Sequence, residues 1–307
     1  MKMMNNKALS LLLILSLIFL TRCNSDGYTD TPTTGELTIT VDETFKPFID
    51  SEISTFEGIY NYADVTVSYK PEGEAFNDLL NDTVKLIIVS RPLNKEELKV
   101  FERWEIVPKV TKVAYDAVAL IGNKDLKDSV ITIDELKKII SGEGSLKSNV
   151  VFDNNNSSTI NFLMEKTGVK KLSENCYALN SNKAVIDYVA KEKNAIGVIG
   201  VNWISDRDDT TNLSFLKSIK VLEVAANINS EYYKPYQAYI AQKIYPLYRE
   251  VYIISKEAYT GLGTGFTSFV ASERGQRIVL KFGLVPATMP VRLVEFKESE
   301  DLYINQE

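Results

Sequence analysis

Residues 85–98, KLIIVSRPLNKEEL, decide the fold class. Residues 85–89 predict a buried strand, and a polar loop then leads into a predicted helix at residues 95–101. The same order occurs upstream, where residues 36–41 alternate apolar and polar side chains and residues 45–59 have apolar side chains at helical spacing, with Thr44 as the predicted N-cap. Strands that alternate with helices indicate an α/β protein with a mostly parallel sheet covered on both faces.

The rest of the chain continues this alternation. Thr132 and Glu135 have the spacing of a capping box, and Gly142 follows the predicted helix as a stop signal. The glycine-rich residues 261–265 match no phosphate-binding motif and predict a flexible loop. Further strands are predicted at residues 150–152, 195–198, 219–224 and 251–254, and further helices at residues 183–191, 265–271 and 273–282 and from Thr159.

Composition excludes several classes of function. The 307 residues contain no histidine, which rules out His-dependent catalytic triads and His-ligated metal sites. The sequence pI of about 5.1 argues against a nucleic-acid-binding surface. The length predicts about two domains. These counts exclude the most common hydrolase designs.

The N-terminus has the pattern of an export signal. Residues 1–22 carry two lysines before an apolar run that is too short to span a membrane, which predicts a signal peptide. Residues 20–23, LTRC, resemble a bacterial lipobox, so we predict lipidation of Cys23, with Arg22 as an unusual residue at that site. Cleavage there would remove three basic residues and change the formal net charge from −6 to −9. Residues 23–35 would form a polar tether, and Cys176 would be the remaining free thiol, which we interpret as a packing residue.

Ligands of α/β sheets bind beyond the C-terminal ends of strands, where helix N-termini present free N–H groups. Four loops qualify, at residues 42–45, 72–75, 90–94 and 153–159. Ser157, Ser158 and Thr159 could cradle a tetrahedral oxyanion, or could simply cap a helix. Arg91 could offer a fork of donors to an anion, or could be an ordinary surface arginine.

Several motifs occur in the order found in phosphate-type solute-binding proteins of ABC importers. They are Ser90-Arg91-Pro92-Leu93 with Glu96-Glu97-Leu98, Tyr115-Asp116-Ala117-Val118-Ala119, the helix ending at Gly142, Ser157-Ser158-Thr159, Ala195-Ile196-Gly197-Val198-Ile199-Gly200, and residues 275–286 from Gly275-Gln276-Arg277-Ile278 to Gly283-Leu284-Val285-Pro286. The chain therefore resembles this PstS-like family, or its Bacteroidetes-type lipoprotein branch.

The resemblance implies a type II periplasmic-binding-protein fold with two α/β lobes joined by two hinge strands. Domain I would comprise residues 36–115 and 247–307, and domain II residues 116–246. It further implies a lipid-anchored periplasmic monomer, with no cofactor and no enzymatic activity, that traps phosphate or a related oxyanion for an ABC permease. The implied ligand contacts are Thr44, Ser90, Arg91, Asp153, Ser157, Ser158 and Thr159.

The chain departs from the family at its anion-binding positions. Asp153 stands where the family has an arginine, Ser90 stands in place of an acceptor aspartate, and Glu72 and Glu74 replace a Gly-Ser loop. A carbohydrate- or peptide-binding protein, or an adhesion protein, using the tyrosines of residues 232–252 is one alternative. An enzyme with a carboxylate pair such as Asp153 and Glu74 is another. Calcium at Asp206, Asp208 and Asp209 is a minor alternative, because that loop lacks the Gly and Glu of an EF-hand.

Overall fold

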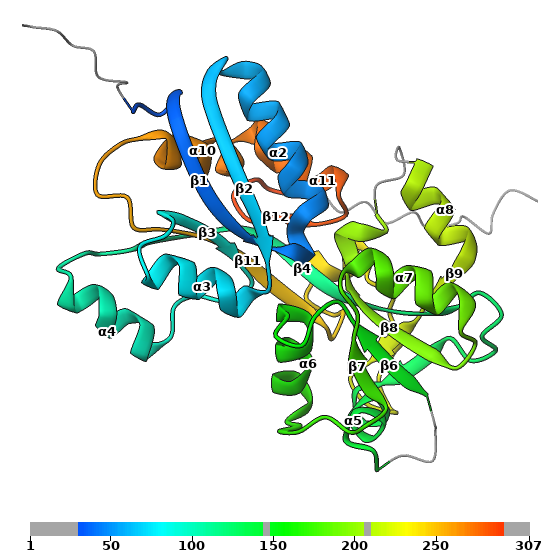
Figure 1. Cartoon of the computed structure of the whole chain (residues 1–307). Coiled ribbons are helices and arrows are strands. Elements are labelled where there is room, and N and C mark those ends of the chain that lie inside the picture. Colours follow the sequence, from blue (N-terminus) through cyan, green and yellow to red (C-terminus); the bar gives the residue numbers. More distant parts are fainter. Residues whose placement is uncertain (1–29, 144–147, 206–209, 292–307) are drawn as a thin grey trace, which may run out of the picture.

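The computed structural model describes residues 30–143, 148–205 and 210–291. In these ranges, ten strands form one curled sheet with the order β2-β1-β3-β11-β4-β8-β6-β7, and β9 and β12 pair with β4 off this path. Helices flank the sheet on both sides, and the strands spread into two groups that β4 connects (Figure 1). The predicted α/β class is confirmed.

The first group of elements repeats the strand–helix unit. Strand β1 pairs in parallel with both β2 and β3, as the alternation predicted. Asn94 and Glu97 form a capping box that fixes the start of α4. The elements are β1 (Thr34–Asp42), the 3-10 turn η1 (Glu43–Phe45), α2 (Lys46–Ile59), β2 (Tyr62–Lys70), α3 (Glu72–Leu80), β3 (Leu86–Val89) and α4 (Lys95–Arg103).

Two long strands connect the groups. Strand β4 (Lys109–Asn123) pairs antiparallel with β11 (Tyr248–Ser255) and β12 (Val285–Pro286) along its first part, and with β8 and β9 along its second. Strand β11 also pairs antiparallel with β3. The sheet is therefore mixed: the strands on either side of β4 and β11 pair in parallel, whereas β4 and β11 pair antiparallel with each other and with their neighbours β8 and β3.

The second group contains the helix that begins at the predicted hydroxyl cluster. Strand β6 pairs in parallel with β7 and β8. The predicted capping box of Thr132 and Glu135 is present, and Gly142 ends that helix with φ +78°. The elements are β5 (Val130–Thr132), α5 (Ile133–Ser141), β6 (Asn149–Phe152), α6 (Ser158–Thr167), β7 (Cys176–Ala178), α7 (Asn182–Lys191), β8 (Ala195–Gly200), the 3-10 turn η2 (Val201–Trp203), α8 (Thr210–Ser218), β9 (Ile219–Val221), β10 (Glu223–Ala225) and α9 (Gln237–Ala241).

The C-terminal helices return to the first group. Helices α10 (Leu262–Ala271) and α11 (Glu273–Lys281) pack near α2 and β1 (Figure 1). The prediction of a flexible glycine-rich loop is wrong for most of that segment, because α10 begins at Leu262. Buried Glu257 accepts N–H groups at the start of α10, including that of Gly263 at 3.1 Å, and so replaces the missing helical partners. Asp30 also accepts from the N–H of Leu262 at 2.7 Å, so the chain packs against the body before β1 begins.

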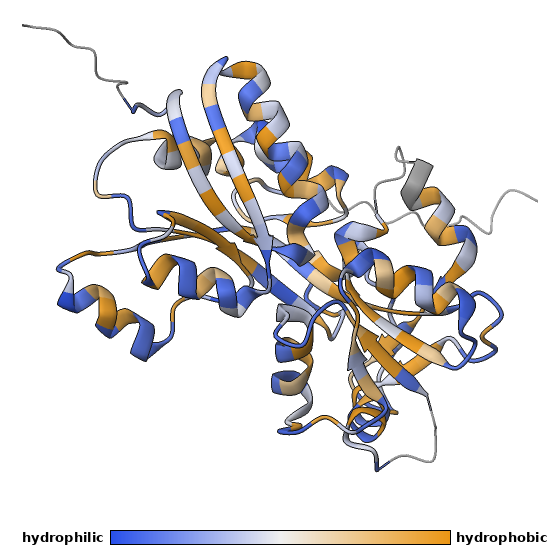
Figure 2. Cartoon of the chain, viewed as in Figure 1, coloured by the Kyte–Doolittle hydropathy of each residue, from blue (hydrophilic) through white to orange (hydrophobic). Residues whose placement is uncertain are grey.

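Apolar side chains fill the space between the sheet and the helices. All residues of β3 and of β8 are buried, and both strands are strongly hydrophobic (Figure 2). One carboxyl group interrupts this core: Glu52 of α2 has no exposed surface, and neither of its oxygens has a hydrogen-bond partner. None of the helices in the described ranges is long and apolar enough to cross a membrane.

Candidate functional site

The predicted hydroxyl cluster forms the start of α6. Ser157 is the N-cap and accepts from the N–H of Ile160 at 3.4 Å, so the capping interpretation is correct. Its hydroxyl also lies 2.9 Å from that of Thr159, which donates to Asp153 at 2.9 Å. Ser157, Ser158 and Thr159 are all buried. The first N–H groups of α6 have no partner within the helix, as at any helix start.

Thr44 lies opposite this helix start. It belongs to η1, which Asp42 caps by accepting the Thr44 N–H at 3.1 Å, so Thr44 is not the helix N-cap that the sequence predicted. The hydroxyls of Thr44 and Ser158 are 3.4 Å apart. In addition, Asn202 Nδ2 and Trp203 Nε1 donate to the Thr44 carbonyl at 3.0 and 2.9 Å. The first and second groups of elements therefore meet at Thr44.

An arginine that the sequence analysis missed lies at the centre of this arrangement. Arg249 of β11 donates from Nε to Asp116 of β4 at 2.8 Å and from Nη1 to the Ser158 hydroxyl at 2.8 Å. Only 2% of its side chain is exposed, and the ring of Phe45 lies 5.1 Å from the guanidinium carbon. Burial disfavours its charge, but the carboxyl groups of Asp116 and Asp42 nevertheless raise the pKa of Arg249. This guanidinium stays protonated.

Three carboxyl groups act directly on the guanidinium, and two more interact with one of these three. The five carboxyl groups and Arg249 are called the acid cluster below. Burial raises the pKa of Asp42 and that of Asp116 despite the opposing effect of Arg249. Burial and the charge of Asp153 raise the pKa of Glu43 to about 7, and burial and Asp42 raise that of Asp153 to about 6. The carboxyl groups are those of Asp42, Glu43, Glu72, Asp116 and Asp153.

Three side-chain atoms of the acid cluster are buried without a hydrogen-bond partner. They are Arg249 Nη2, Asp42 Oδ2 and Asp116 Oδ1. Asn202 Oδ1, beside Thr44, is a fourth such atom. Buried polar atoms without partners are uncommon because each costs about 1–3 kcal/mol. A bound molecule that both accepts and donates hydrogen bonds would satisfy them.

Ser90 and Arg91 each bind a carboxyl group of a neighbouring helix. The N–H and hydroxyl of Ser90 both donate to Glu72, at 2.6 and 2.7 Å. Burial and the neighbouring Asp42 raise the pKa of Glu72. Arg91 donates through Nη1 and Nη2 to Glu97 at 2.9 and 2.8 Å, and 40% of its side chain is exposed. The structure therefore joins Glu72 to the acid cluster and pairs Arg91 with Glu97 of α4, and Arg91 Nε also lies 4.0 Å from a carboxyl oxygen of Glu72.

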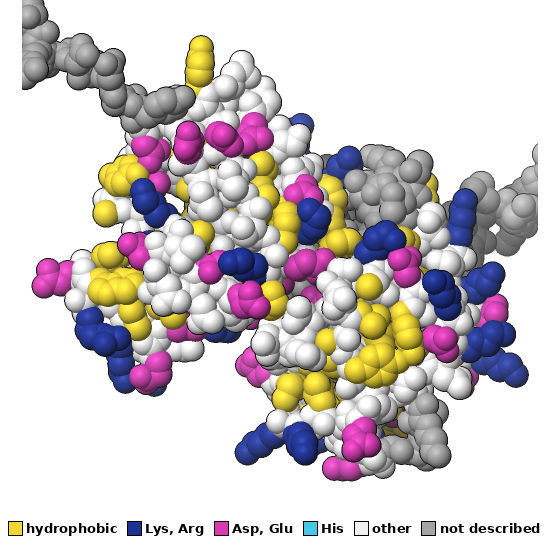
Figure 3. Space-filling model, in the orientation of Figure 1, with side chains coloured by type: hydrophobic (Ala, Val, Ile, Leu, Met, Phe, Trp, Pro, Cys, Tyr) yellow, Lys and Arg dark blue, Asp and Glu magenta, His cyan; other side chains and the backbone are white. Residues whose placement is uncertain are grey.

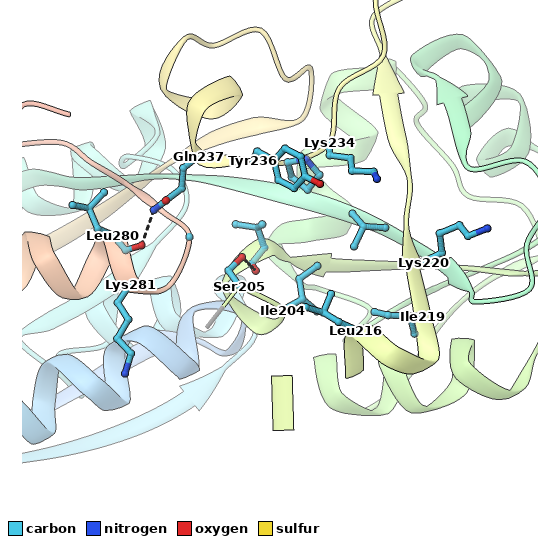
Figure 4. A pocket seen from close by; sticks show the side chains of 14 residues that line it. Ile204, Ser205, Leu216, Ile219, Lys220, Lys234, Tyr236, Gln237, Leu280 and Lys281 are labelled. Atoms are coloured by element: carbon cyan, nitrogen blue, oxygen red, sulfur yellow. Dashed lines mark hydrogen bonds between the residues drawn. The ribbon is translucent and has the colours of Figure 1, made fainter. Parts of the chain in front are cut away.

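A separate groove of about 820 Å³ lies between α11 and the β9 region (Figure 4). Its lining includes Lys220 and Lys234 but none of the predicted contacts. Lys220 donates to the Leu126 carbonyl at 2.6 Å, and Lys234 lies 3.6 Å from a carboxyl oxygen of Glu223. Lys281 also lines the groove, and Lys220 and Lys234 both have protein partners.

The structure also places the residues of the alternative hypotheses. Glu74 is exposed on α3, whereas Asp153 is buried. Tyr245 is fully buried and donates to the Val118 carbonyl at 2.9 Å. Cys176 is half-buried, and burial raises its pKa, as expected for a packing residue. Cys23 and the aspartates at 206, 208 and 209 lie outside the described residues, in which no group of three or more Asp, Glu and Cys side chains could hold a metal ion.

A family model described as the PBP superfamily domain matches residues 26–274. The chain belongs to the PBP superfamily. The phosphate-binding protein PstS of Borreliella burgdorferi is 27% identical over 260 residues, which cover 79% of this chain and 86% of that protein. These findings support a PstS-like family of non-enzymatic solute-binding proteins, as the sequence resemblance implied.

Solved structures show the same fold. A substrate-binding protein from Clostridium perfringens with bound phosphate has a TM-score of 0.71 at 21% identity, and the match covers 82% of this chain and all (100%) of that chain. PstS from Borrelia burgdorferi has a TM-score of 0.53 at 25% identity, with 82% and 98% covered. The predicted type II periplasmic-binding-protein fold is thereby confirmed for this PBP superfamily member.

Proposed function

We propose that this protein is the solute-binding component of a phosphate-type ABC importer and binds phosphate or a related oxyanion at the acid cluster. The observation that carries the proposal is Arg249, a buried guanidinium with one free nitrogen beside the start of α6. A buried cation with an unpartnered donor is suited to an anion that brings its own acceptors. The names of the relatives support this ligand class.

The donors around Arg249 suit a tetrahedral oxyanion. The guanidinium offers Nη1 and Nη2, and the hydroxyls of Ser158 and Thr44 lie 3.4 Å from each other. The first turn of α6 adds backbone N–H groups and the positive end of the helix dipole. Arg249 would thus take the role of the family arginine that Asp153 replaces, from a different element of the fold.

The carboxyl groups set a condition on the ligand. Asp42 Oδ2 and Asp116 Oδ1 have no donor in the protein, and ionised carboxylates there would repel an anion. A phosphate that carries protons could donate to such an oxygen, and a protonated carboxyl group could donate to the phosphate. We infer that the ligand, the site or both are protonated in the complex.

The binding motion would be a hinge closure of two lobes. Domain I would comprise residues 36–115 and 247–307, and domain II residues 116–246, with β4 and β11 as the hinge strands. Support comes from β4, which pairs with β11 at one end and with β8 at the other. The contacts of Thr44 with Ser158, Asn202 and Trp203 would form on closure and break on opening.

The cellular setting follows from the N-terminal sequence. We propose that residues 1–22 are removed, that Cys23 carries a lipid, and that the protein is a periplasmic monomer tethered to a membrane, where it delivers solute to an ABC permease. Mass spectrometry of the protein purified from membranes should show a diacylated Cys23. Recovery of an unmodified Cys23 would contradict the lipid anchor and leave the ligand proposal unaffected.

Calorimetry tests the ligand. The purified protein should release or absorb heat on titration with phosphate, and millimolar phosphate should raise its melting temperature. Arg249→Lys keeps the charge but loses the fork, so we expect at least a tenfold weaker affinity. Arg277→Lys, at an exposed arginine of α11 that pairs with Glu273, is the matched control and should bind like the wild type. No heat and no thermal stabilisation by phosphate in the wild-type protein would refute the proposal.

One observation favours a second candidate. A guanidinium beside several carboxyl groups also suits a solute with a carboxylate and an ammonium group, such as an amino acid or a peptide terminus. Thermal stabilisation by amino acids and short peptides, with none by phosphate, would select this ligand class.

A further inference from the structure

Acidic residues from both proposed lobes meet at the contact between them, called the seam here. Asp42 and Glu43 end β1 and begin η1, on the domain I side. Asp153 precedes α6 on the domain II side, and the Asn182 side chain of α7 donates to Glu43 across the seam. An acidic patch lies near the middle of this face, where the two groups of elements meet, with Lys or Arg side chains beside it (Figure 3). Closing the lobes therefore brings like charges together.

The charged groups that act on Glu43 and Asp153 are carboxyl groups. Among the described residues, Glu43 faces Asp42 and Asp153, and Asp153 faces Asp42. Asp42 in turn interacts with Glu72, with Asp116 and with the buried cation Arg249 of β11. Arg249 is already paired with Asp116 at 2.8 Å. Full ionisation would thus leave several carboxylates facing one another in a buried space, which is unfavourable.

We propose that the lobes close by taking up protons on Glu43 and Asp153, so that solute is held more tightly as the pH falls from 8 to 6. This inference rests on the hinge motion and ligand site of the proposed function. Opening would return both carboxyl groups to water, where they lose these protons. The seam would then couple solute release to deprotonation.

The expected size of the effect follows from proton linkage. With the two groups of elements in contact, burial and neighbouring carboxyl groups raise the pKa of Glu43 from 4.5 to about 7 and that of Asp153 from 3.8 to about 6. If opening returns both groups to water, their pKa values fall back to these ordinary values. A raised pKa favours the closed form below that pKa, and the advantage is lost as the pH rises through it. For these two groups together, the ratio of closed to open protein should rise roughly twentyfold as the pH falls from 8 to 6. Glu43 supplies most of this factor because its pKa is the higher.

Phosphate titration of paired variants tests the coupling. Phosphate itself titrates near pH 7, so the measured quantity is the ratio of the wild-type and Glu43→Gln dissociation constants at each pH. Glutamine cannot take up the proton but can still accept a hydrogen bond from Asn182. We expect this ratio to change roughly tenfold between pH 8 and pH 6. Glu74→Gln removes an exposed acid of the same type and should leave the ratio unchanged.

A second calorimetric readout counts protons. Phosphate titrations at pH 7 in two buffers of different ionisation enthalpy give the number of protons taken up on binding. Glu43→Gln should take up about half a proton fewer than the wild type, because the Glu43 pKa in the closed form is about 7. Equal proton uptake, with a constant affinity ratio, would overturn the inference while leaving phosphate binding intact.

If phosphate does not bind at all, the proposed function fails and the seam is tested without a ligand. Small-angle X-ray scattering of the wild-type protein should then show a smaller radius of gyration at pH 5 than at pH 8. The double variant Glu43→Gln/Asp153→Asn should remove that difference. Identical wild-type scattering at both pH values, in a protein that does not bind phosphate, would overturn the inference as well.

Discussion

Replacing Glu52 with glutamine should remove a steep pH dependence of the protein's stability. Glu52 lies in α2 with no exposed surface and no hydrogen-bond partner for either oxygen. Burial raises its pKa from 4.5 to about 9. The folded protein therefore keeps a proton on Glu52 across this range, whereas the unfolded chain releases it. Stability from this group is complete below about pH 4.5 and is lost as the pH rises through about 9.

The magnitude follows from the two pKa values. Each pH unit between them costs about 1.4 kcal/mol, so the whole range is worth about 6 kcal/mol. Between pH 6 and pH 8 the Glu52 contribution falls by about 2.7 kcal/mol. Glutamine has a similar shape and does not ionise, so Glu52→Gln should lose this part of the pH dependence and become the more stable form at pH 8.

Urea unfolding followed by circular dichroism at pH 6, 7 and 8 measures this effect. Other buried carboxyl groups also titrate, so the quantity to compare is the slope of the free energy of unfolding against pH, in the wild type and in the variant. Glu36→Gln, an exposed site on β1, is the matched control and should reproduce the wild-type slope. Parallel pH profiles for the wild type and Glu52→Gln would refute the reasoning.

Four further substitutions test other contacts, the first three by urea unfolding. Gly283→Ala should lower the free energy of unfolding by about 1–3 kcal/mol, because Gly283 has φ +74° and a Cβ there would lie 2.3 Å from a neighbouring side chain. Gly73→Ala in α3 is the control: its Cβ would meet nothing within 4 Å, so it should raise the free energy of unfolding by about 0.5 kcal/mol. Equal effects of the two would contradict the steric argument. Glu257→Ala leaves the first N–H groups of α10 without their acceptor and should cost about 2–3 kcal/mol, and a neutral result would show that water replaces the carboxylate. Trp203→Phe removes the 2.9 Å hydrogen bond to the Thr44 carbonyl and should weaken phosphate binding about fivefold, for a loss of about 1 kcal/mol. An unchanged phosphate affinity in calorimetry would show that this hydrogen bond does not contribute to closure.

The sequence correctly predicted those elements whose pattern lies within a few neighbouring residues. The capping box at Thr132, the buried strand β3 and the start of α6 need only a few neighbouring residues, and all three are present. The prediction that Thr44 caps the first helix was wrong. A 3-10 turn that Asp42 caps lies between β1 and α2, and Thr44 lies inside this turn. The pattern of polar residues indicates that a helix begins nearby but does not fix which residue caps it.

The centre of the candidate site was missed because it is assembled from distant segments. Arg249 lies in β11, but the strand predicted there covered only residues 251–254, so the sequence analysis left Arg249 outside any element. A signal was nevertheless present: in β11 the alternation places Arg249 on the same side as Val251 and Ile253, which are buried. Asp116 likewise lies in β4 between buried alanines and valines. A charge on the buried face of a strand requires a partner, but its partner lies 133 residues away in sequence.

The position of β11 between β3 and β4 constrains how the chain can be made. Strand β3 ends at Val89, and the strand that covers its open edge begins only at Tyr248, after the whole second group of elements. At typical rates of synthesis, the two segments emerge about ten to thirty seconds apart. During that interval an entirely apolar strand has an unpaired edge that other chains could join. The topology that places Arg249 at the centre of the protein thus gives the nascent chain a period in which it depends on protection from aggregation.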